Sequence, residues 1–379
     1  MTLPATQPNY HDNTETGAPV LNNTAGSVVA LITAVAVTGY NVRSVLQVSV
    51  TSGVATAMCL GHGYSATFGK LVKLSGVSVP ALNGNKQLSS VSTDAFTYPA
   101  PGVADGVYDT GSMEARRAPL GWEVAHVNGA GTVAIFRRPA LEASGSMLRV
   151  VDTMVSPAST TYALASIVET ATDADTVTGE TPTATADRLW MRGVNSAAAK
   201  KWVIVGNSLR AWIMFQGSAA HANVVPFFYG DPSPLYVADV GRCFFVGYGT
   251  VSITSAGGFG NVIPSLFAPT AGLSQLVFQR DKSGVALGAT ATLCGAGRWG
   301  QNVGVAGVST PVPVIGDYYL KTATEVRARL PELYLPQADQ PFSDGTFYAI
   351  GGRQLLALTI NTNQTTLGQM MLDLSAPWE

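Results

Sequence analysis

Two apolar-alternating runs around a turn signal decide the fold class: Val45-Leu-Gln-Val-Ser-Val-Thr51, then Ser52-Gly53, then Val54-Ala-Thr-Ala-Met-Cys-Leu60. Both runs are rich in residues that pack well on a pleated sheet. The Ser-Gly pair between them is a turn signal, so the segment predicts a β-hairpin. Further short β-runs follow, with Asn83-Gly84 as another turn signal. Residues 45–111 therefore predict a small β-barrel or β-sandwich module.

The same pattern of short β-runs continues through residues 112–379, which predict a larger, β-sandwich-like body. Its clearest element is the run from Trp202 to Phe215, which predicts a hairpin turned at Gly206-Asn207. The stretch Thr170–Thr185 is polar and aperiodic and predicts an exposed loop. Long helical periodicity is nearly absent, and 40 glycines and 21 prolines suit many strands and turns. The chain is therefore expected to be mainly β, with few short helices.

The N-terminal segment has a different composition. Residues 1–25 are polar and rich in Pro, Asn and Thr, which predicts an extended arm with no core of its own, of the kind that often lies along a neighbouring subunit in an assembly. Residues 26–44 are expected to form a short helix and a connector. Ser27 can cap the helix and Gly39 can follow its end, although the valines between them favour a strand.

Charge is scarce along the whole chain. Only 12% of the residues are Asp, Glu, Lys or Arg, against roughly 25% in typical soluble proteins. This favours a chain whose surface is largely covered by neighbours, and the alternative is a neutral Ser/Thr surface. The net charge of −2, without a basic stripe, gives no case for specific nucleic-acid binding.

Other features constrain the compartment. Cys59, Cys243 and Cys294 lie far apart and have no metal-site spacing, which fits buried, reduced thiols in a chain folded in a cytoplasm. The N-terminus resembles no signal peptide. The longest apolar run, Val28–Val37, is shorter than the roughly 20 residues that cross a bilayer, so we expect no membrane insertion.

Signatures of catalysis are weak. The sequence contains neither a GxSxG nor a P-loop motif, and no helical pattern follows the GxGxxG match at Gly295–Gly300. No metal-binding spacing relates the four histidines, His11, His62, His126 and His221. His62, between two glycines, is expected to be a turn histidine. We therefore expect no enzyme, no cofactor and no metal. The enzyme alternative to test first is carbohydrate cleavage by two facing aspartates.

Several motifs are distinctive: Gly17-Ala-Pro-Val-Leu-Asn-Asn-Thr-Ala-Gly-Ser-Val28, Ala118-Pro-Leu-Gly-Trp-Glu123, Leu148-Arg-Val-Val-Asp152, Tyr229-Gly-Asp231, Leu330-Pro-Glu-Leu-Tyr-Leu-Pro336 and Asp373-Leu-Ser-Ala-Pro-Trp378. With these motifs the chain resembles a family of tailed-bacteriophage virion structural proteins that is associated with the tail and neck. Gly61-His-Gly63, Leu82-Asn-Gly84 and Phe96-Thr-Tyr98 also resemble a small FCCH-like β-module inserted in phage structural proteins.

The resemblance implies a virion component of the tail, neck or baseplate, assembled in the host cytoplasm. Its partners would be copies of itself in a symmetric oligomer and other virion proteins, with possible contact to a host surface. The alternatives are a receptor-binding or glycan-binding fibre or spike module, and a head decoration protein. We expect assembly contacts at both ends of the chain, at Pro8, Tyr10, Pro377 and Trp378, because both ends are expected to be extended and Trp is a common interface anchor.

Overall fold

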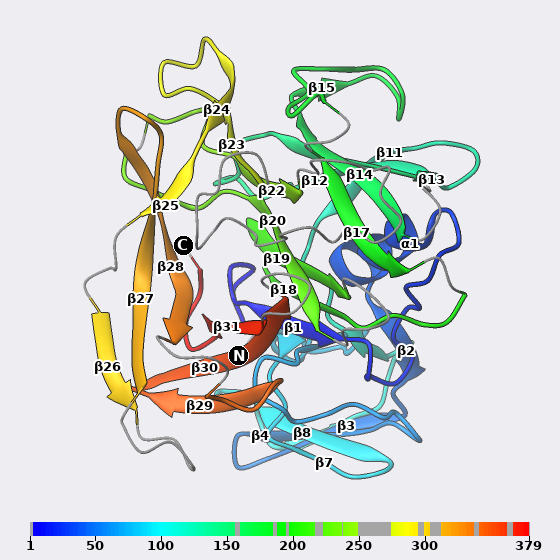
Figure 1. Cartoon of the computed structure of the whole chain (residues 1–379). Helices are drawn as coiled ribbons and strands as arrows, with labels where there is room; N and C mark the ends of the chain where they lie inside the picture. Colours follow the sequence, from blue (N-terminus) through cyan, green and yellow to red (C-terminus); the bar gives the residue numbers. More distant parts are fainter. Residues whose placement is uncertain are drawn as a thin grey trace.

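The structure is a computed structural model, and its fold is mainly β, as the sequence predicts (Figure 1). It describes residues 3–155, 160–184, 188–194, 197–216, 223–236, 238–248, 274–294, 299–303, 312–336, 341–361 and 367–378.

The small module is a two-layered β-sandwich. One layer consists, in spatial order, of β2 (Tyr40–Ser44), β10 (Glu114–Arg117), β5 (Val72–Ser75) and β6 (Gly84–Lys86). The other consists of β7 (Ser90–Val91), β8 (Ala95–Pro99), β4 (Val54–Met58), β3 (Gln47–Thr51) and β9 (Gly106–Tyr108). A short 3-10 turn, η2 (Pro80–Leu82), precedes β6. The inner faces share one apolar core. The module thus runs from Tyr40 to Arg117, longer than the expected 45–111, because β2 and β10 complete the first layer.

The hairpin expected at the start of the module is present. Thr51 pairs with Val54 across the turn, and Ser52 and Gly53 have φ of 50° and 76°. Two consecutive residues in the left-handed region match the twist of the flanking strands. Glycine adopts this conformation freely, and Ser52 adopts it at a small cost.

The predicted short helix is also present, but its cap comes from elsewhere. The helix α1 (Ser27–Ile32) continues as a π-helical segment, η1 (Thr33–Thr38), and Gly39 follows with φ of 74°. Gly26, not Ser27, occupies the N-cap position. The Asp152 carboxylate accepts a hydrogen bond of 2.8 Å from the backbone N–H of Val28, so a distant strand caps the helix.

The other strands, apart from one small hairpin, form a single connected sheet of twenty strands. They are β1 (Asn9–Asp12), β11 (Glu123–Val127), β12 (Val133–Arg137), β13 (Met147–Val155), β14 (Thr160–Val168), β17 (Leu189–Val194), β18 (Trp202–Gly206), β19 (Arg210–Gln216), β20 (Val224–Gly230), β21 (Ser233–Pro234), β22 (Phe244–Tyr248), β23 (Ser274–Arg280), β24 (Leu287–Thr290), β25 (Thr292–Cys294), β26 (Trp299–Val303), β27 (Val312–Lys321), β28 (Val326–Pro336), β29 (Thr346–Ile350), β30 (Arg353–Asn361) and β31 (Leu367–Asp373). The small hairpin, β15 (Thr170–Ala171) and β16 (Val177–Thr178), lies in the stretch expected to be a loop.

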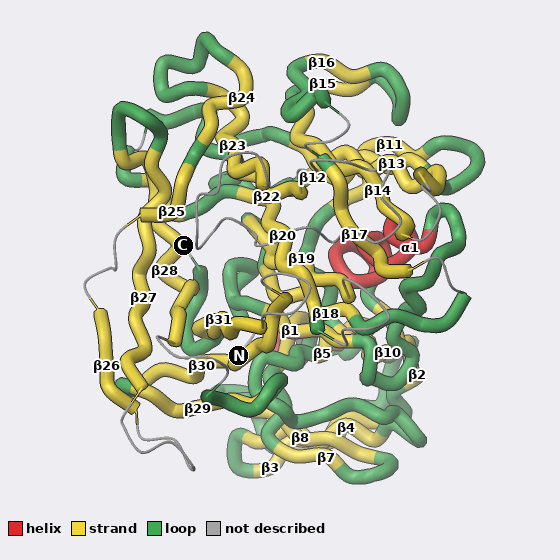
Figure 2. Tube along the Cα trace, viewed as in Figure 1, coloured by secondary structure: helices red, strands yellow, loops and turns green. Residues whose placement is uncertain are grey.

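The central strands of this sheet are buried on both faces. Ile213 of β19 packs in a core with α1 and β12–β14, whereas Trp212 and Met214 point into a second core with β27–β31. Alternate residues of a strand face opposite sides, so β18–β20 separate two apolar layers. Figure 2 shows these strands in the middle of the molecule, with the module below them. The hairpin expected between Trp202 and Phe215 is confirmed as β18 and β19.

The expected N-terminal arm is part of this body rather than a free extension. Strand β1 pairs antiparallel with β18, with Tyr10 opposite Val205. All four residues of β1 are buried. The prediction of an arm without a core was wrong for this segment, because the polar side chains of β1 find buried partners inside the same chain. Among the described residues, no helix has the length and apolar character needed to cross a bilayer.

Candidate functional site: a charged cleft beside the N-terminal strand

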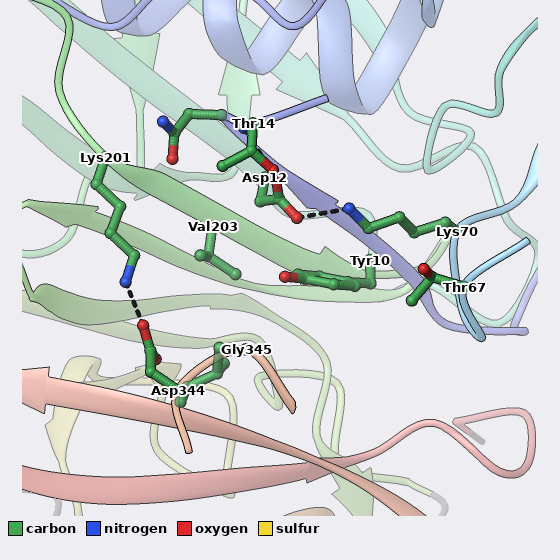
Figure 3. A pocket seen from close by; sticks show the side chains of 11 residues that line it. Tyr10, Asp12, Thr14, Thr67, Lys70, Lys201, Val203, Asp344 and Gly345 are labelled. Carbon is green, nitrogen blue, oxygen red and sulfur yellow. Dashed lines mark hydrogen bonds and ion pairs between the residues drawn. The ribbon is translucent and has the colours of Figure 1, made fainter. Parts of the chain in front are cut away.

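A cleft of about 350 Å³ opens where the N-terminal strand, the module and the body meet (Figure 3). Its lining residues are Tyr10, Asp12, Asn13, Thr14, Thr67, Lys70, Lys201, Val203, Asp344, Gly345 and Leu358. The side chains of Asp12 and Lys70 point toward each other on one side, and those of Lys201 and Asp344 meet on the other. Three distant parts of the chain therefore build one polar site.

Strand β1 positions the first side of the cleft. Because alternate side chains of a strand face opposite directions, Tyr10 and Asp12 face the cleft while Asn9 and His11 face away. Asn9 accepts a hydrogen bond of 3.1 Å from the backbone N–H of Leu71 in the module. The strand is thus fixed to the body by its backbone, and to the module by its side chains and by the backbone N–H of Tyr10, which donates a hydrogen bond of 2.8 Å to the carbonyl oxygen of Gly69.

The pair Lys70–Asp12 is the closest charge contact at this side. Lys70 Nζ lies 2.7 Å from Asp12 Oδ2 and 3.3 Å from Glu15 Oε1, and 4.9 Å from the centre of the Tyr10 ring. Burial by itself would raise the pKa of Asp12. Hydrogen bonds from Lys70 and Thr14 outweigh that effect and hold the pKa below its ordinary value. Burial raises the pKa of the Tyr10 hydroxyl, with the negative charge of Asp12 adding to the shift.

The second side of the cleft is more open. Lys201 Nζ lies 2.5 Å from Asp344 Oδ2, and about a third of each side chain is exposed. Asp344 also accepts a hydrogen bond of 2.8 Å from the backbone N–H of Thr359 in β30. This pair joins the segment before β18 to the loop before β29, so it bridges two parts of the body across the cleft.

A buried network behind the cleft continues the contacts of β1. Arg117 forms an ion pair with Glu15 and donates a hydrogen bond of 2.6 Å to the carbonyl oxygen of Tyr10. Tyr40 donates a hydrogen bond of 2.7 Å to Glu15, and His11 Nδ1 lies 3.0 Å from the Tyr40 hydroxyl. Desolvation lowers the pKa of His11 well below its ordinary value, and the charges of Arg117 and Lys70 add to the effect. The histidine is therefore neutral at neutral pH.

The chemistry of the site is that of charge pairing. Each lysine of the cleft faces a carboxylate at ion-pair distance, and the described residues contain no group of three or more His, Cys, Asp or Glu side chains able to hold a metal. His62 lies elsewhere, in the module, where its Nδ1 accepts a hydrogen bond of 2.8 Å from the backbone N–H of Tyr64. It is a turn histidine, as predicted. His221 and Gly295–Arg298, part of the GxGxxG match, lie outside the described residues.

The four residues expected to make assembly contacts are buried or half-buried against other parts of the same chain. Pro8 and Tyr10 are buried, Trp378 is 3% exposed and Pro377 is half-buried. The backbone N–H of Trp378 donates a hydrogen bond of 2.9 Å to the carbonyl oxygen of Thr6. Tyr10 and Trp378 therefore pack into the chain's own core, and the assembly contacts expected at these four residues stay a prediction.

One turn of the body holds both ends together. The Asn207 side chain, in the turn between β18 and β19, donates hydrogen bonds to the carbonyl oxygens of Thr6 at 2.7 Å and Trp378 at 3.1 Å. The Arg210 guanidinium lies 5.7 Å from the centre of the Trp378 ring. The side chain that organises the termini is thus the asparagine of the turn.

No functional site was predicted from the sequence at Lys70, Lys201 or Asp344. Basic doublets such as Lys200–Lys201 are usually solvated or paired surface groups; here Lys200 is buried, and Lys201 lines the cleft and is paired with Asp344. No local pattern marks these residues, because their partners are more than fifty positions away in the sequence. Comparison of the chain with models of known families and with curated proteins gives no match.

Proposed function

We propose that the chain is a structural subunit of a tailed-phage virion, in the tail, neck or baseplate, and that it acts by assembly with its own copies and with other virion proteins. The motifs that resemble phage tail and neck proteins support the virion assignment. The distribution of charge on the molecule supports the assembly role, most clearly on the outer sheet face of the module.

The outer layer of the module, β7-β8-β4-β3-β9, has no charged residue in any of its strands. Its outward face presents Ser90, Thr97, Thr56, Ser49 and Val107 side by side in one cross-strand row. In Figure 1 this layer lies at the lower end of the molecule, away from the central strands. The solvent-exposed face of an antiparallel sheet is usually polar, and protein surfaces commonly carry charges of both signs. A neutral face at the end of the molecule suits a protein contact.

Burial removes charge from the surface as well. Thirteen Asp, Glu, Lys or Arg side chains among the described residues are buried: Asp12, Lys70, Lys86, Arg117, Arg138, Asp152, Lys200, Arg210, Asp231, Asp239, Arg327, Glu332 and Asp373. Several are bound in ion pairs, such as Arg210–Glu332 at 3.1 Å. The surface is thus poorer in charge than the composition suggests, and a neutral surface promotes association.

No enzymatic role is proposed. In the cleft, each lysine forms an ion pair with a carboxylate. This pairing supports a role in holding the module against the body rather than in acid–base chemistry. Turnover of host polysaccharide by the purified chain, lost on substitution of one aspartate, would contradict this part of the proposal.

The decisive experiment has two measurements. Mass spectrometry and cryo-EM of purified particles of the phage that encodes the chain should find it at stoichiometric copy number in the tail, neck or baseplate. Substitution of Thr56, at the centre of the neutral face, by lysine should reduce incorporation at least tenfold. Thr172→Lys, on the exposed β15–β16 hairpin, is the matched control and should incorporate normally.

Absence of the chain from particles would overturn the proposal. A position at the tip of a fibre would favour the receptor-binding alternative, and a position on the capsid surface would favour head decoration. Normal incorporation of Thr56→Lys would show that the neutral face is not an assembly contact.

A further inference from the structure

One of the two ion pairs of the cleft has a third member. Lys70 Nζ lies 2.7 Å from Asp12 Oδ2 and 3.3 Å from Glu15 Oε1 (Figure 3 shows the first contact). The three side chains are each about nine-tenths buried. An ammonium group, the carboxylate that it contacts and a second carboxylate within its reach are thus held together, largely away from water.

The two oxygen atoms of the Asp12 carboxylate have different partners. Oδ2 accepts a hydrogen bond from Lys70, whereas Oδ1 accepts one of 2.8 Å from the backbone N–H of Thr14 and another from the Thr14 hydroxyl. Two donors directed at one oxygen stabilise negative charge that develops on it, as in the oxyanion holes of acyl-transfer enzymes. Asp12 is therefore arranged as an acyl group in which Oδ1 can hold charge while Oδ2 departs.

Glu15 is fixed where it can take a proton from Lys70. Its Oε2 accepts a hydrogen bond of 2.7 Å from the Tyr40 hydroxyl and forms an ion pair with Arg117. Its Oε1 accepts a hydrogen bond of 3.3 Å from the backbone N–H of Asp12. These contacts hold Oε1 beside Lys70 Nζ. A carboxylate held beside a nitrogen nucleophile can act as its general base.

We propose that this site forms an isopeptide bond between Lys70 and Asp12, which attaches the module to the N-terminal strand covalently. A bond forms between Lys70 Nζ and Asp12 Cγ, and the bond between Cγ and Oδ2 breaks. One ammonium proton passes to Oδ2. Glu15 takes a second proton from the nitrogen and gives it to the same oxygen, which leaves as water. An ammonium and a carboxylate thus give an amide and one water molecule, and the balance needs no other reactant.

The surroundings of the pair favour this condensation. Folding holds Lys70 Nζ in contact with the Asp12 carboxylate, which replaces a bimolecular encounter by an intramolecular one. The reacting form is the neutral pair, which arises when one proton moves from Nζ to Oδ2 along their hydrogen bond, and burial lowers the cost of losing both charges. The cleft beside the pair gives the released water a path to solvent.

The bond needs the folded state of one chain. Lys70 and Asp12 lie 58 positions apart, so the unfolded chain does not hold them together. The inference therefore goes beyond the proposed function and does not depend on it, because neither a second copy nor a particle is required.

Mass spectrometry of the purified full-length chain tests the bond directly. The folded wild type, incubated at neutral pH and then denatured, should have lost the mass of one water molecule per chain. Trypsin should then give a branched peptide in which residues 1–43 are joined to residues 44–73, because an acylated Lys70 is no longer a cleavage site. Folded wild type that keeps its full mass and gives separate peptides ending at Arg43 and Lys70 would overturn the inference.

Two substitutions separate the groups of the reaction. Lys70→Arg keeps the positive charge but should abolish the loss of water, because a guanidinium stays protonated and is no nucleophile. Glu15→Gln should slow the loss by about a hundredfold or more, the usual contribution of a general base. Circular dichroism shows whether each variant folds, and the measurement on the wild type needs neither of them. Condensation of folded Glu15→Gln at the wild-type rate would overturn the role of Glu15.

The second ion pair of the cleft is the matched control. Among the described residues, Lys201 forms an ion pair with Asp344 alone, and about a third of each side chain is exposed. This pair should stay ionic, so trypsin should cleave after Lys201. Lys201→Met should lose water as fast as the wild type. A branched peptide at Lys201 would show that contact alone is sufficient and would overturn the roles given to burial and to Glu15.

Discussion

Lys70 of the module and Asp12 of the N-terminal strand meet at 2.7 Å, and this ion pair joins the two parts of the molecule that the sequence separates most clearly. Both side chains are about nine-tenths buried. The module is thus attached to the body through a charge contact as well as through apolar packing, and the charge contact is made by the N-terminal strand of the body.

Lys70→Met should lower the free energy of unfolding by about 3 kcal/mol, because it leaves the buried Asp12 carboxylate without its cation. Chemical denaturation measures the change. The control is Arg137→Met, which breaks the ion pair with Glu123 in which both side chains are about half exposed. That variant should lose less than about 1 kcal/mol. Equal losses in the two variants would contradict the role given to Lys70.

Stability should fall as the pH is lowered from 7 toward 5, and His11 should cause part of the fall. Desolvation, aided by Arg117 and Lys70, lowers the pKa of His11 in the folded chain. The unfolded chain takes up a proton near pH 6.5, whereas the folded chain does not, so acid favours unfolding by up to about 1.4 kcal/mol per pH unit.

Denaturation of His11→Gln at several pH values tests this assignment. The variant should have a flatter dependence than the wild type between pH 7 and 5. His126→Gln, which changes a half-buried histidine of β11, is the control for the loss of a histidine. An unchanged slope in His11→Gln would show that other groups cause the acid sensitivity.

Trp378→Ala should reduce the free energy of unfolding by about 3–5 kcal/mol, the usual cost of removing a large buried aromatic side chain. The indole also donates a hydrogen bond of 2.7 Å to the carbonyl oxygen of Asp373. Trp378→Phe keeps most of the volume and should lose less. If Trp378→Ala unfolds like the wild type but fails to assemble, the residue is an interface anchor after all.

Asp152→Ala should destabilise the chain by about 1–2 kcal/mol through loss of the cap of α1. The residue lies on β13, and its carboxylate accepts from the first turn of the helix. Thermal unfolding of Asp152→Ala and Asp152→Asn separates the hydrogen bond from the charge. Asparagine should restore part of the loss, and equal melting temperatures for all three chains would exclude the capping role.

Local signals in the sequence predicted the local structure well. The positive φ values of Gly53 and Gly39 follow from a residue type that turns and helix ends favour. The alternation in Val45–Thr51 identified a strand with one buried face. Each of these inferences needs only neighbouring residues, so a single sequence contains the information.

Long-range contacts could not be predicted in this way. The cleft needs Asp12, Lys70, Lys201 and Asp344 to converge, and nothing near any of them indicates its partner. Asn-Tyr-His-Asp at positions 9–12 has no apolar alternation, so nothing in it indicates a buried strand, although all four residues are buried and Asn9 is hydrogen-bonded to the module. The role of Asn207 could not be predicted either, because its side chain bonds to residues at both ends of the chain that are far away in the sequence.

The pairing of β1 with β18 also has a consequence for synthesis of the chain. Asn9 pairs with Gly206, so the first strand leaves the ribosome long before its partner exists. At about 5–20 residues per second, the delay is roughly 10–40 s. An apolar strand left unpaired for that time would be an aggregation hazard. The polar residues of β1 keep it hydrated until β18 has been synthesised. The polar composition that made this strand hard to predict thereby protects the nascent chain.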